Sequence, residues 1–195
     1  KNSQRDVLTG RSAFKSNDAP DKLVDFPEEM ITSIEEMAKK KLMKGEVKTQ
    51  PWSDDYWPIY KGILGARYAD SQFETIAKSK SYNDIRKYVD EQEDIFSIIG
   101  NVNTAPTSSS VDNLSPSEKY DLLIGDASSA LTKAMWAQGK SYADQNGGKV
   151  ETWMGICHGW APAAYMELRT KNMITVLAAD GRTPINFYPA DIKAL

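Results

Sequence analysis

The spacing of apolar residues predicts that helices fill the first half of the chain. Between Pro27 and Met43, apolar side chains recur at intervals of three and four residues, the spacing of one helix face. Pro27 suits a first helical turn, and Gly45 suits the residue that follows the last one. Three later segments show the same spacing and are expected to be helices: 60–68, 71–78 and 82–99.

A polar stretch separates these helices from a second helical group. Residues 101–113 are rich in Thr, Ser and Asn and almost free of large apolar side chains, which is typical of a surface loop. Ser115, Pro116 and Glu118 then suit the N-cap, first and third positions of a capping box. A helix is therefore expected to begin at Pro116, and a longer one to follow over 127–144.

Two short apolar runs near the end predict a β-hairpin. Residues 173–177 and 184–188 are rich in β-branched and other apolar side chains. Asp180 and Gly181 lie between them, a pair that favours a tight turn between antiparallel strands. The expected fold is therefore α+β, with a mainly helical N-terminal part packed on a small antiparallel sheet.

The only cysteine and the only histidine of the chain, Cys157 and His158, are adjacent within Gly-Ile-Cys-His-Gly-Trp-Ala-Pro-Ala-Ala. We expect a helix to begin here, and the unpaired N–H groups of a helix N-terminus favour a thiolate and can hold an oxyanion. A single cysteine is usually a small buried apolar residue. However, Gly155 and Gly159, which permit close backbone approach and unusual torsions, and the bulky Trp160 favour a nucleophile at Cys157.

The residues around Cys157 resemble those of known cysteine acyltransferases. Gly-x-Cys followed by Trp-Ala is similar to the nucleophile segments of papain-like proteases and of transglutaminases. The closer resemblance is to the transglutaminase elicitor family, the oomycete wall transglutaminases and their marine bacterial relatives. Four segments carry this resemblance, which covers about residues 50–195: Pro-Trp-Ser-Asp-Asp-Tyr-Trp-Pro at 51–58, Leu-Ser-Pro-Ser-Glu-Lys-Tyr-Asp at 114–121, Cys-His-Gly-Trp-Ala-Pro-Ala at 157–163 and Phe-Tyr-Pro-Ala-Asp-Ile-Lys-Ala-Leu at 187–195.

The resemblance implies a protein–glutamine γ-glutamyltransferase, or transglutaminase, with a papain-like or transglutaminase-like core. In that reaction Cys157 attacks the γ-carboxamide of a protein glutamine and ammonia leaves. A lysine amine or water then takes the acyl group from the thioester. Two alternatives stay open: a papain-like cysteine peptidase or cell-wall amidase with the same thioester chemistry, and a non-catalytic recognition or elicitor module whose cysteine is inert.

A cysteine nucleophile needs a base, normally a histidine that Asp or Asn orients. His158 is the only histidine, but consecutive side chains on a helix diverge by about 100°. His158 can therefore serve only if the backbone is not helical there, and Pro162 would tolerate a helix that begins near residue 161. We expect instead that a continuation beyond Leu195, or a second chain, supplies the catalytic histidine.

Aromatic residues supply the other candidates for the site. Trp153 offers an indole N–H as an oxyanion donor, with a wall-forming role as the alternative. Papain-like enzymes place an oxyanion-binding glutamine six residues before the nucleophile, where this chain has Glu151, whose carboxylate would repel an oxyanion. Trp160, Trp57 and Tyr56 are candidates to line a substrate groove, with packing in the core as the alternative.

Acidic residues offer weak candidates for a Ca²⁺ site. Asp54 and Asp55 are adjacent, and Asp121 and Asp126 lie five residues apart. Calcium needs several oxygen ligands, and none of these residues has the spacing of an EF-hand loop. Solvated charge, or helix capping for Asp126, is the alternative role.

The chain is expected to have two parts. Residues 1–49 form a polar arm with one amphipathic helix, which is a candidate inhibitory pro-region or an ordinary packing helix. Residues 50–195 are expected to be the N-terminal part of a catalytic domain that is incomplete without a continuation or another chain.

Composition and the first residue bear on location and partners. The chain begins with Lys1, which suggests a cleaved secretory signal and a secreted or periplasmic protein. The formal net charge of −3 gives no sign of nucleic-acid binding, and no apolar run is long enough to span a membrane. The expected partners are glutamine and lysine side chains of other proteins.

Overall fold

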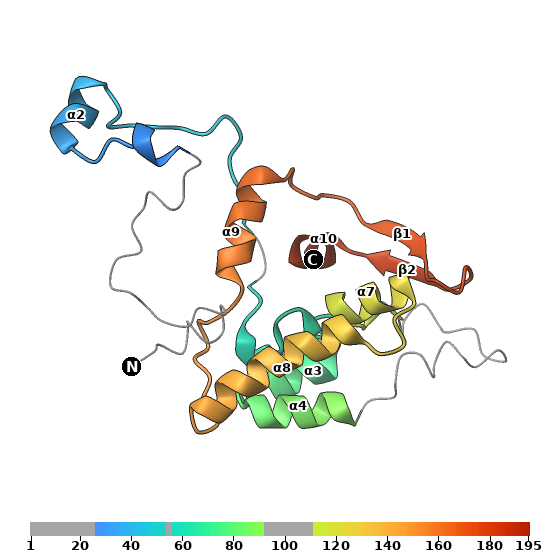
Figure 1. Cartoon of the computed structure of the whole chain (residues 1–195). Helices are drawn as coiled ribbons and strands as arrows, with labels where there is room; N and C mark the ends of the chain where they lie inside the picture. Colours follow the sequence, from blue (N-terminus) through green and yellow to red (C-terminus); the bar gives the residue numbers. More distant parts are fainter. Residues whose placement is uncertain (1–25, 54–55, 92–110) are drawn as a thin grey trace. The chain divides into compact units, whose positions relative to one another are not determined.

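A computed structural model describes residues 26–53, 56–91 and 111–195 (Figure 1). Contacts divide the chain into two compact units, residues 1–50 and 51–195. The functional labels expected for the two parts, a pro-region and an incomplete catalytic domain, stay predictions. The polar residues 1–20 lie outside the described residues.

The N-terminal unit contains less helix than expected. A 3-10 turn, η2 (Pro27–Glu29), precedes α2 (Ile34–Lys39), so the prediction of one continuous helix from Pro27 to Met43 is wrong. Ser33 has an extended backbone and its Oγ accepts a hydrogen bond from Glu36 N at 3.4 Å, so a new helix begins there. Because α2 buries no residue, packing does not lengthen it.

The C-terminal unit carries most of the secondary structure, and it confirms an α+β fold that is mainly helical. Its helices and turns are η3 (Ile59–Lys61), η4 (Ile63–Gly65), α3 (Ser71–Ala77), α4 (Tyr82–Asp90), α7 (Pro116–Ile124), α8 (Ala130–Gln145), α9 (Cys157–Met166) and α10 (Pro189–Ala194). Its strands are β1 (Ile174–Leu177) and β2 (Pro184–Phe187). No helix in the described parts of the chain is long and apolar enough to cross a bilayer.

Most of the predicted helices of this unit are confirmed. α3 and α8 lie where expected, and the capping box starts α7, which ends at the left-handed Gly125. α4 begins at Tyr82 as predicted, but it ends at Asp90 instead of continuing to residue 99. Residues 92–110, and with them most of the predicted loop, lie outside the described residues.

The predicted helix over 60–68 is wrong, because two 3-10 turns, η3 and η4, take its place. Gly62 between them has a φ of +91°, and a Cβ there would lie 2.4 Å from Cη2 of Trp136. The chain turns at this glycine so that α8, which carries Trp136, packs against η3 and η4.

The predicted hairpin is confirmed. β1 and β2 are antiparallel, with Ile174 opposite Phe187 and Leu177 opposite Pro184. In the turn, Asp180 Oδ1 accepts hydrogen bonds from the backbone N–H groups of the two residues before β2, at 2.8 and 2.9 Å. Hydrogen bonds, led by the Thr183 hydroxyl, lower the pKa of Asp180 and so hold it ionised.

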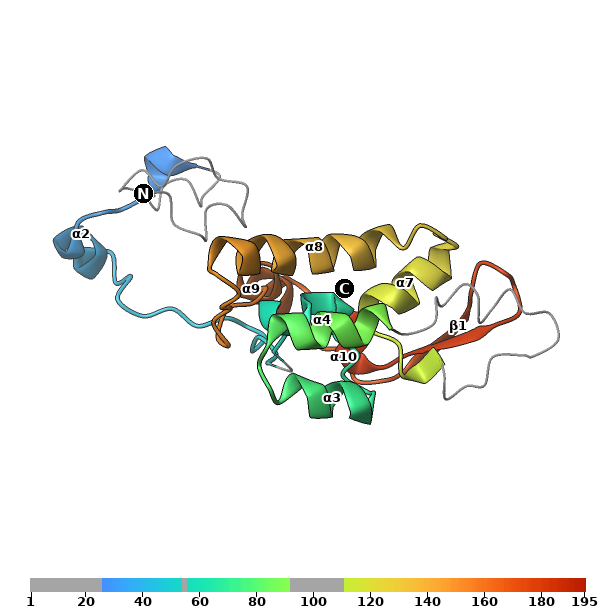
Figure 2. The same ribbon diagram turned by 90° about the horizontal axis from the view of Figure 1, so that it is seen from below.

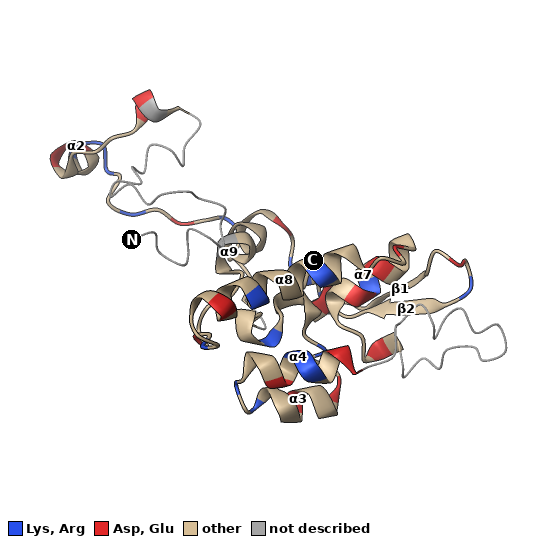
Figure 3. Ribbon diagram, turned by 60° about the horizontal axis from the view of Figure 1, so that its bottom comes forward, with Lys and Arg blue, Asp and Glu red and all other residues tan. Residues whose placement is uncertain are grey.

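The core of this unit lies where its helices pack on one another and on the hairpin. α8 packs against α4, α7 and both 3-10 turns, and α3 packs against α4 (Figures 1 and 2). The hairpin packs against α7, and α10 contacts α7, α9 and β2. An apolar cluster is formed by buried residues of α7, the hairpin and the segment before α7: Val111, Leu114, Leu122, Ala178, Ile185 and Phe187. Acidic and basic residues are interspersed over α4, α7 and α8, whereas the only charged residue of α3 is Glu74 (Figure 3).

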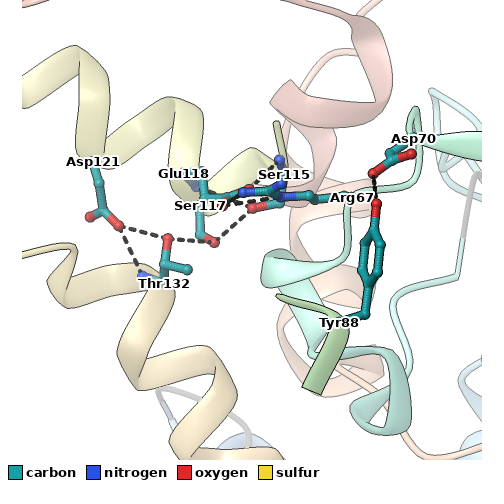
Figure 4. Close-up of polar contacts among 8 residues, drawn as sticks. All are labelled: Arg67, Asp70, Tyr88, Ser115, Ser117, Glu118, Asp121 and Thr132. Carbon is teal, nitrogen blue, oxygen red and sulfur yellow. Dashed lines mark hydrogen bonds and ion pairs between the residues drawn. The ribbon is translucent and has the colours of Figure 1, made fainter. Parts of the chain in front are cut away.

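Segment 114–121 is buried although it is polar. Glu118 pairs with Arg67, with Nη2 and Oε1 2.5 Å apart, and its Oε2 also accepts a hydrogen bond from Ser115 N at 2.8 Å (Figure 4). The Thr132 hydroxyl of α8 lies 3.0 Å from Ser117 Oγ and 2.7 Å from Asp121 Oδ2. These contacts join α7 to α8 and to the segment after η4, and they give the buried polar side chains of this segment hydrogen-bond partners.

A second buried ion pair joins two distant segments. Lys119 Nζ lies 2.6 Å from Asp191 Oδ2, and both side chains are 0 % exposed. Asp191 Oδ2 also accepts a hydrogen bond from Tyr188 N at 2.8 Å, and Lys119 Nζ lies 5.0 Å from the centre of the Tyr188 ring. The pair therefore anchors α10 to α7.

Candidate active site

Cys157 is the first residue of α9, as the sequence predicted, and its side chain is exposed. Ile156 O accepts hydrogen bonds from Gly159 N at 2.9 Å and Trp160 N at 3.0 Å. The first N–H groups of the helix, beginning with that of Cys157, have no acceptor within the helix. The thiol therefore stands at the positive end of the helix dipole, beside free backbone donors.

The segment before Cys157 is fastened to a distant part of the chain. Gly155 forms an isolated antiparallel bridge with Pro58, and Ile59 N donates to Met154 O at 2.8 Å. Further upstream, the hydroxyl of Tyr142 donates a hydrogen bond to Glu151 Oε2. These contacts hold the backbone that leads into α9.

The prediction that a glycine permits close backbone approach is confirmed for Gly155 and is wrong for Gly159. A Cβ on Gly155 would lie 2.4 Å from Trp57 O and 2.9 Å from Cε2 of Tyr56, which no side chain tolerates. A Cβ on Gly159 would have no neighbour within 4 Å, and neither glycine has a positive φ. Gly155 is therefore needed for the bridge to Pro58, whereas Gly159 is an exposed helical residue.

We expect Gly155→Ala to lower the free energy of unfolding by about 1–3 kcal/mol, because the added methyl group separates the bridged segments. The rate at which iodoacetamide labels Cys157 should also change, since this backbone leads directly into α9. Gly159→Ala is the matched control and should stabilise α9 by up to about 1 kcal/mol. Urea unfolding and labelling rates check both variants, and equal behaviour of the two would contradict the proposed role of the bridge.

Tyr56 lies beside Gly155 and is 45 % exposed. The pKa of Tyr56 is raised to about 12, mainly because the side chain is partly buried. The negative charges of Cys157 and Tyr60 raise this pKa further. The phenol therefore stays protonated near neutral pH.

Tyr56 also lines a cavity of about 310 Å³. Trp57 is only 4 % exposed, and its ring meets that of Tyr68 edge to face with centres 5.4 Å apart. Lys61 and Glu74 form an ion pair in the wall, with Nζ and Oε1 3.0 Å apart. All of the lining residues come from segments 56–68 and α3: Tyr56, Trp57, Pro58, Lys61, Ala66, Tyr68 and Glu74.

The tryptophans near Cys157 differ in their surroundings. Trp160, one turn along α9, meets Trp52 edge to face with ring centres 5.4 Å apart, and Trp52 Nε1 donates to Glu167 O at 3.1 Å. Trp52 thereby packs along α9. Trp153 is 69 % exposed, so its indole is open to solvent.

His158 is the second residue of α9, and its side chain lies outside the described residues. A helix that begins near residue 161 is wrong, because α9 begins at Cys157 and the backbone at His158 is helical. The role of His158 as the base stays a prediction. The catalytic base is not assigned within the described part of the chain.

The acidic candidates for calcium have other partners or are not described. Asp54 and Asp55 lie outside the described residues. Asp121 is buried and accepts hydrogen bonds from the backbone N–H groups of Leu131 and Thr132 at 3.2 and 3.0 Å, so it caps the start of α8. Within the described ranges, no three His, Cys, Asp or Glu residues are grouped as metal ligands.

Asp126 also accepts hydrogen bonds from residues at the start of α8. Its Oδ1 accepts hydrogen bonds from the backbone and hydroxyl of Ser128, and its Oδ2 accepts one from Ala130 N at 2.9 Å. These bonds, that of the Ser128 hydroxyl first, lower the pKa of Asp126. The contacts agree with the capping role that was the alternative for this residue.

The comparison with known protein families gives one match. The profile of a family described as transglutaminase elicitor matches residues 22–195. The chain belongs to the transglutaminase elicitor family. No match is found among curated proteins or among solved structures.

The family match extends further than the resemblance predicted from sequence, because it begins at residue 22 instead of about 50. It therefore includes α2 and the rest of the described N-terminal unit. The structure also shows a contact between two of the family-like segments, 114–121 and 187–195. Lys119 of the first forms an ion pair with Asp191 of the second. Periodicity alone missed this pair, and its only signal was the place of both residues in the family-like segments. Tyr56 was named as a candidate to line a substrate groove, but not as a neighbour of Gly155.

Proposed function

We propose that the protein is a protein–glutamine γ-glutamyltransferase with Cys157 as its nucleophile. The observation that carries the proposal is an exposed thiol at the first position of α9, in a chain of the transglutaminase elicitor family. A helix N-terminus favours the thiolate over the thiol and offers N–H donors to an oxyanion.

In the proposed reaction, the sulfur of Cys157 attacks the γ-carboxamide carbon of a protein glutamine. The carbonyl oxygen becomes an oxyanion that the first N–H groups of α9 can stabilise. The intermediate collapses to a thioester, and the proton of the thiol leaves with ammonia. A lysine amine then forms an isopeptide bond and releases the thiol, or water releases glutamate instead.

The base for these proton transfers is proposed to come from another polypeptide, either a continuation of the chain or a second chain that brings a histidine to Cys157. The helical backbone at His158 supports this proposal. A catalytic core related to papain-like enzymes is part of the same proposal, since that arrangement takes its histidine from a later segment than its cysteine.

The test is to incubate the protein with a glutamine peptide and a fluorescent primary amine, with and without Ca²⁺, and to measure ammonia release and amine incorporation. Incorporation that accompanies ammonia release supports the transferase. Cleavage of peptide bonds or of cell-wall amides, without incorporation, would favour the peptidase or amidase. An unreactive thiol and no turnover would favour the recognition or elicitor module, which the family description also supports.

The location is proposed to be outside the cytoplasm, as secreted or periplasmic. The word elicitor in the family description supports this proposal, because an elicitor acts on other cells. Protein glutamine and lysine side chains at a wall or cell surface would then be the substrates.

We further propose that the N-terminal arm is an inhibitory pro-region. The arm exposes large apolar side chains, among them Phe26, Ile34, Leu42 and Met43, which is expected of a segment that acts by binding to a surface. Removal of residues 1–48 should raise both the labelling of Cys157 and the rate of amine incorporation. Unchanged rates in a truncated chain with a normal circular dichroism spectrum would show that the arm is not inhibitory.

A further inference from the structure

The oxyanion of the proposed reaction lacks its usual side-chain donor. Papain-like enzymes supply a glutamine amide six residues before the nucleophile, and this chain has Glu151 there. Glu151 accepts a hydrogen bond from the Tyr142 hydroxyl and lacks the amide N–H groups that a glutamine would offer to an oxyanion. A second donor beside the N–H groups of α9 therefore has to come from a different residue.

The segment that contains Tyr56 is bridged to the residues just before Cys157. The Pro58–Gly155 bridge and the bond from Ile59 N to Met154 O hold the two backbones together. A Cβ on Gly155 would lie 3.1 Å from Cζ of Tyr56, the ring carbon that carries the hydroxyl. The phenol end of Tyr56 therefore lies against a residue only two positions before the nucleophile.

The hydroxyl of Tyr56 is suited to donate. Within the described part of the chain it has no hydrogen-bond partner, and the side chain is half exposed, so a substrate can reach it. Its pKa of about 12 keeps the phenol protonated at neutral pH. The charge of Cys157 contributes to that pKa, which places the phenol within electrostatic range of the reacting sulfur.

We propose that Tyr56 is a catalytic residue whose phenol donates a hydrogen bond to the acyl oxygen while Cys157 attacks the acyl carbon. This inference rests on the proposed role of Cys157 as an acyl-transfer nucleophile. Tyr56 keeps its proton throughout, because the proton that leaves with ammonia is that of the thiol. The exposed indole of Trp153 is the rival donor.

The test compares two reactions of Cys157 that differ only in the need for an oxyanion donor. p-Nitrophenyl acetate transfers its acetyl group to the sulfur through an oxyanion and releases p-nitrophenolate, which leaves without a proton, so no histidine is required. Iodoacetamide alkylates the same sulfur and releases iodide without forming an oxyanion. The ratio of the two rate constants therefore reports on oxyanion stabilisation and not on the amount of thiolate.

We expect Tyr56→Phe to lower the acetylation rate about tenfold and to leave the alkylation rate within about twofold. This expected loss of acetylation rate is smaller than the 10²–10³-fold loss typical of a buried oxyanion donor, because Tyr56 is half exposed. The ring that packs on Gly155 is kept, so the fold should be unchanged. Tyr165→Phe removes a phenol that is 62 % exposed on α9 and is the matched control, for which both rates should be unchanged.

Three outcomes would overturn the proposal. Equal losses in both reactions would show that Tyr56 acts on the thiol or the fold, and no loss in either would show that it has no role. A loss of acetylation in Trp153→Phe and not in Tyr56→Phe would assign the donor to Trp153. A protein that shows the expected ratio but transfers no glutamine acyl group would keep the role of Tyr56 and contradict only the transglutaminase proposal.

Discussion

Cys157→Ala is expected to abolish acyl transfer from glutamine peptides, a loss of about 10⁴-fold or more. No other residue of the chain carries a thiol, so a thioester cannot form in this variant. Stability should change by less than about 0.5 kcal/mol, because the side chain is exposed and alanine is a good helix former. Amine incorporation and thermal unfolding, measured on the same preparation, check both parts.

The control for this variant is His158→Gln, which changes the adjacent helical residue and keeps the thiol. If the base comes from another polypeptide, this control keeps most of the activity of the assembly that contains it. Activity that survives in Cys157→Ala would contradict the nucleophile assignment. Activity lost in His158→Gln as well as in Cys157→Ala would return the base to His158.

Lys119→Met is expected to lower the free energy of unfolding by about 3–5 kcal/mol. The substitution leaves the fully buried carboxylate of Asp191 without its cation, and an unpaired buried charge is among the most costly defects in a protein. Domains of this size are typically stable by only about 5–15 kcal/mol, so the variant should be close to unfolding at 37 °C. Urea unfolding at 25 °C gives the measurement.

Two further variants distinguish the loss of this buried ion pair from the general effect of removing a lysine on stability. Lys140→Met removes one partner of the Lys140–Asp144 pair, whose side chains are 69 % and 63 % exposed, and should cost less than about 0.5 kcal/mol. The double variant Lys119→Met/Asp191→Leu removes both buried charges and should be more stable than Lys119→Met alone. A cost below about 1 kcal/mol for Lys119→Met would contradict the importance of the buried pair.

Local sequence signals predicted the elements that local interactions form. The capping box at Ser115, the hairpin turn at Asp180 and the start of α9 at Cys157 depend on residues within a few positions of one another. The predicted helix over 27–43 failed for the opposite reason. The described α2 buries none of its residues, so packing does not lengthen it, and it is six residues long.

The sequence by itself determined the family-like segments, the α+β class and Cys157 as the one thiol at a helix start. The tertiary structure alone decided which distant residues meet. It places Tyr56 beside Gly155, pairs Lys119 with Asp191, and turns Asp121 from a calcium candidate into the cap of α8. Periodicity reports only which face of an element is buried, whereas these contacts join residues from 10 to almost 100 positions apart, and only the folded chain brings them together.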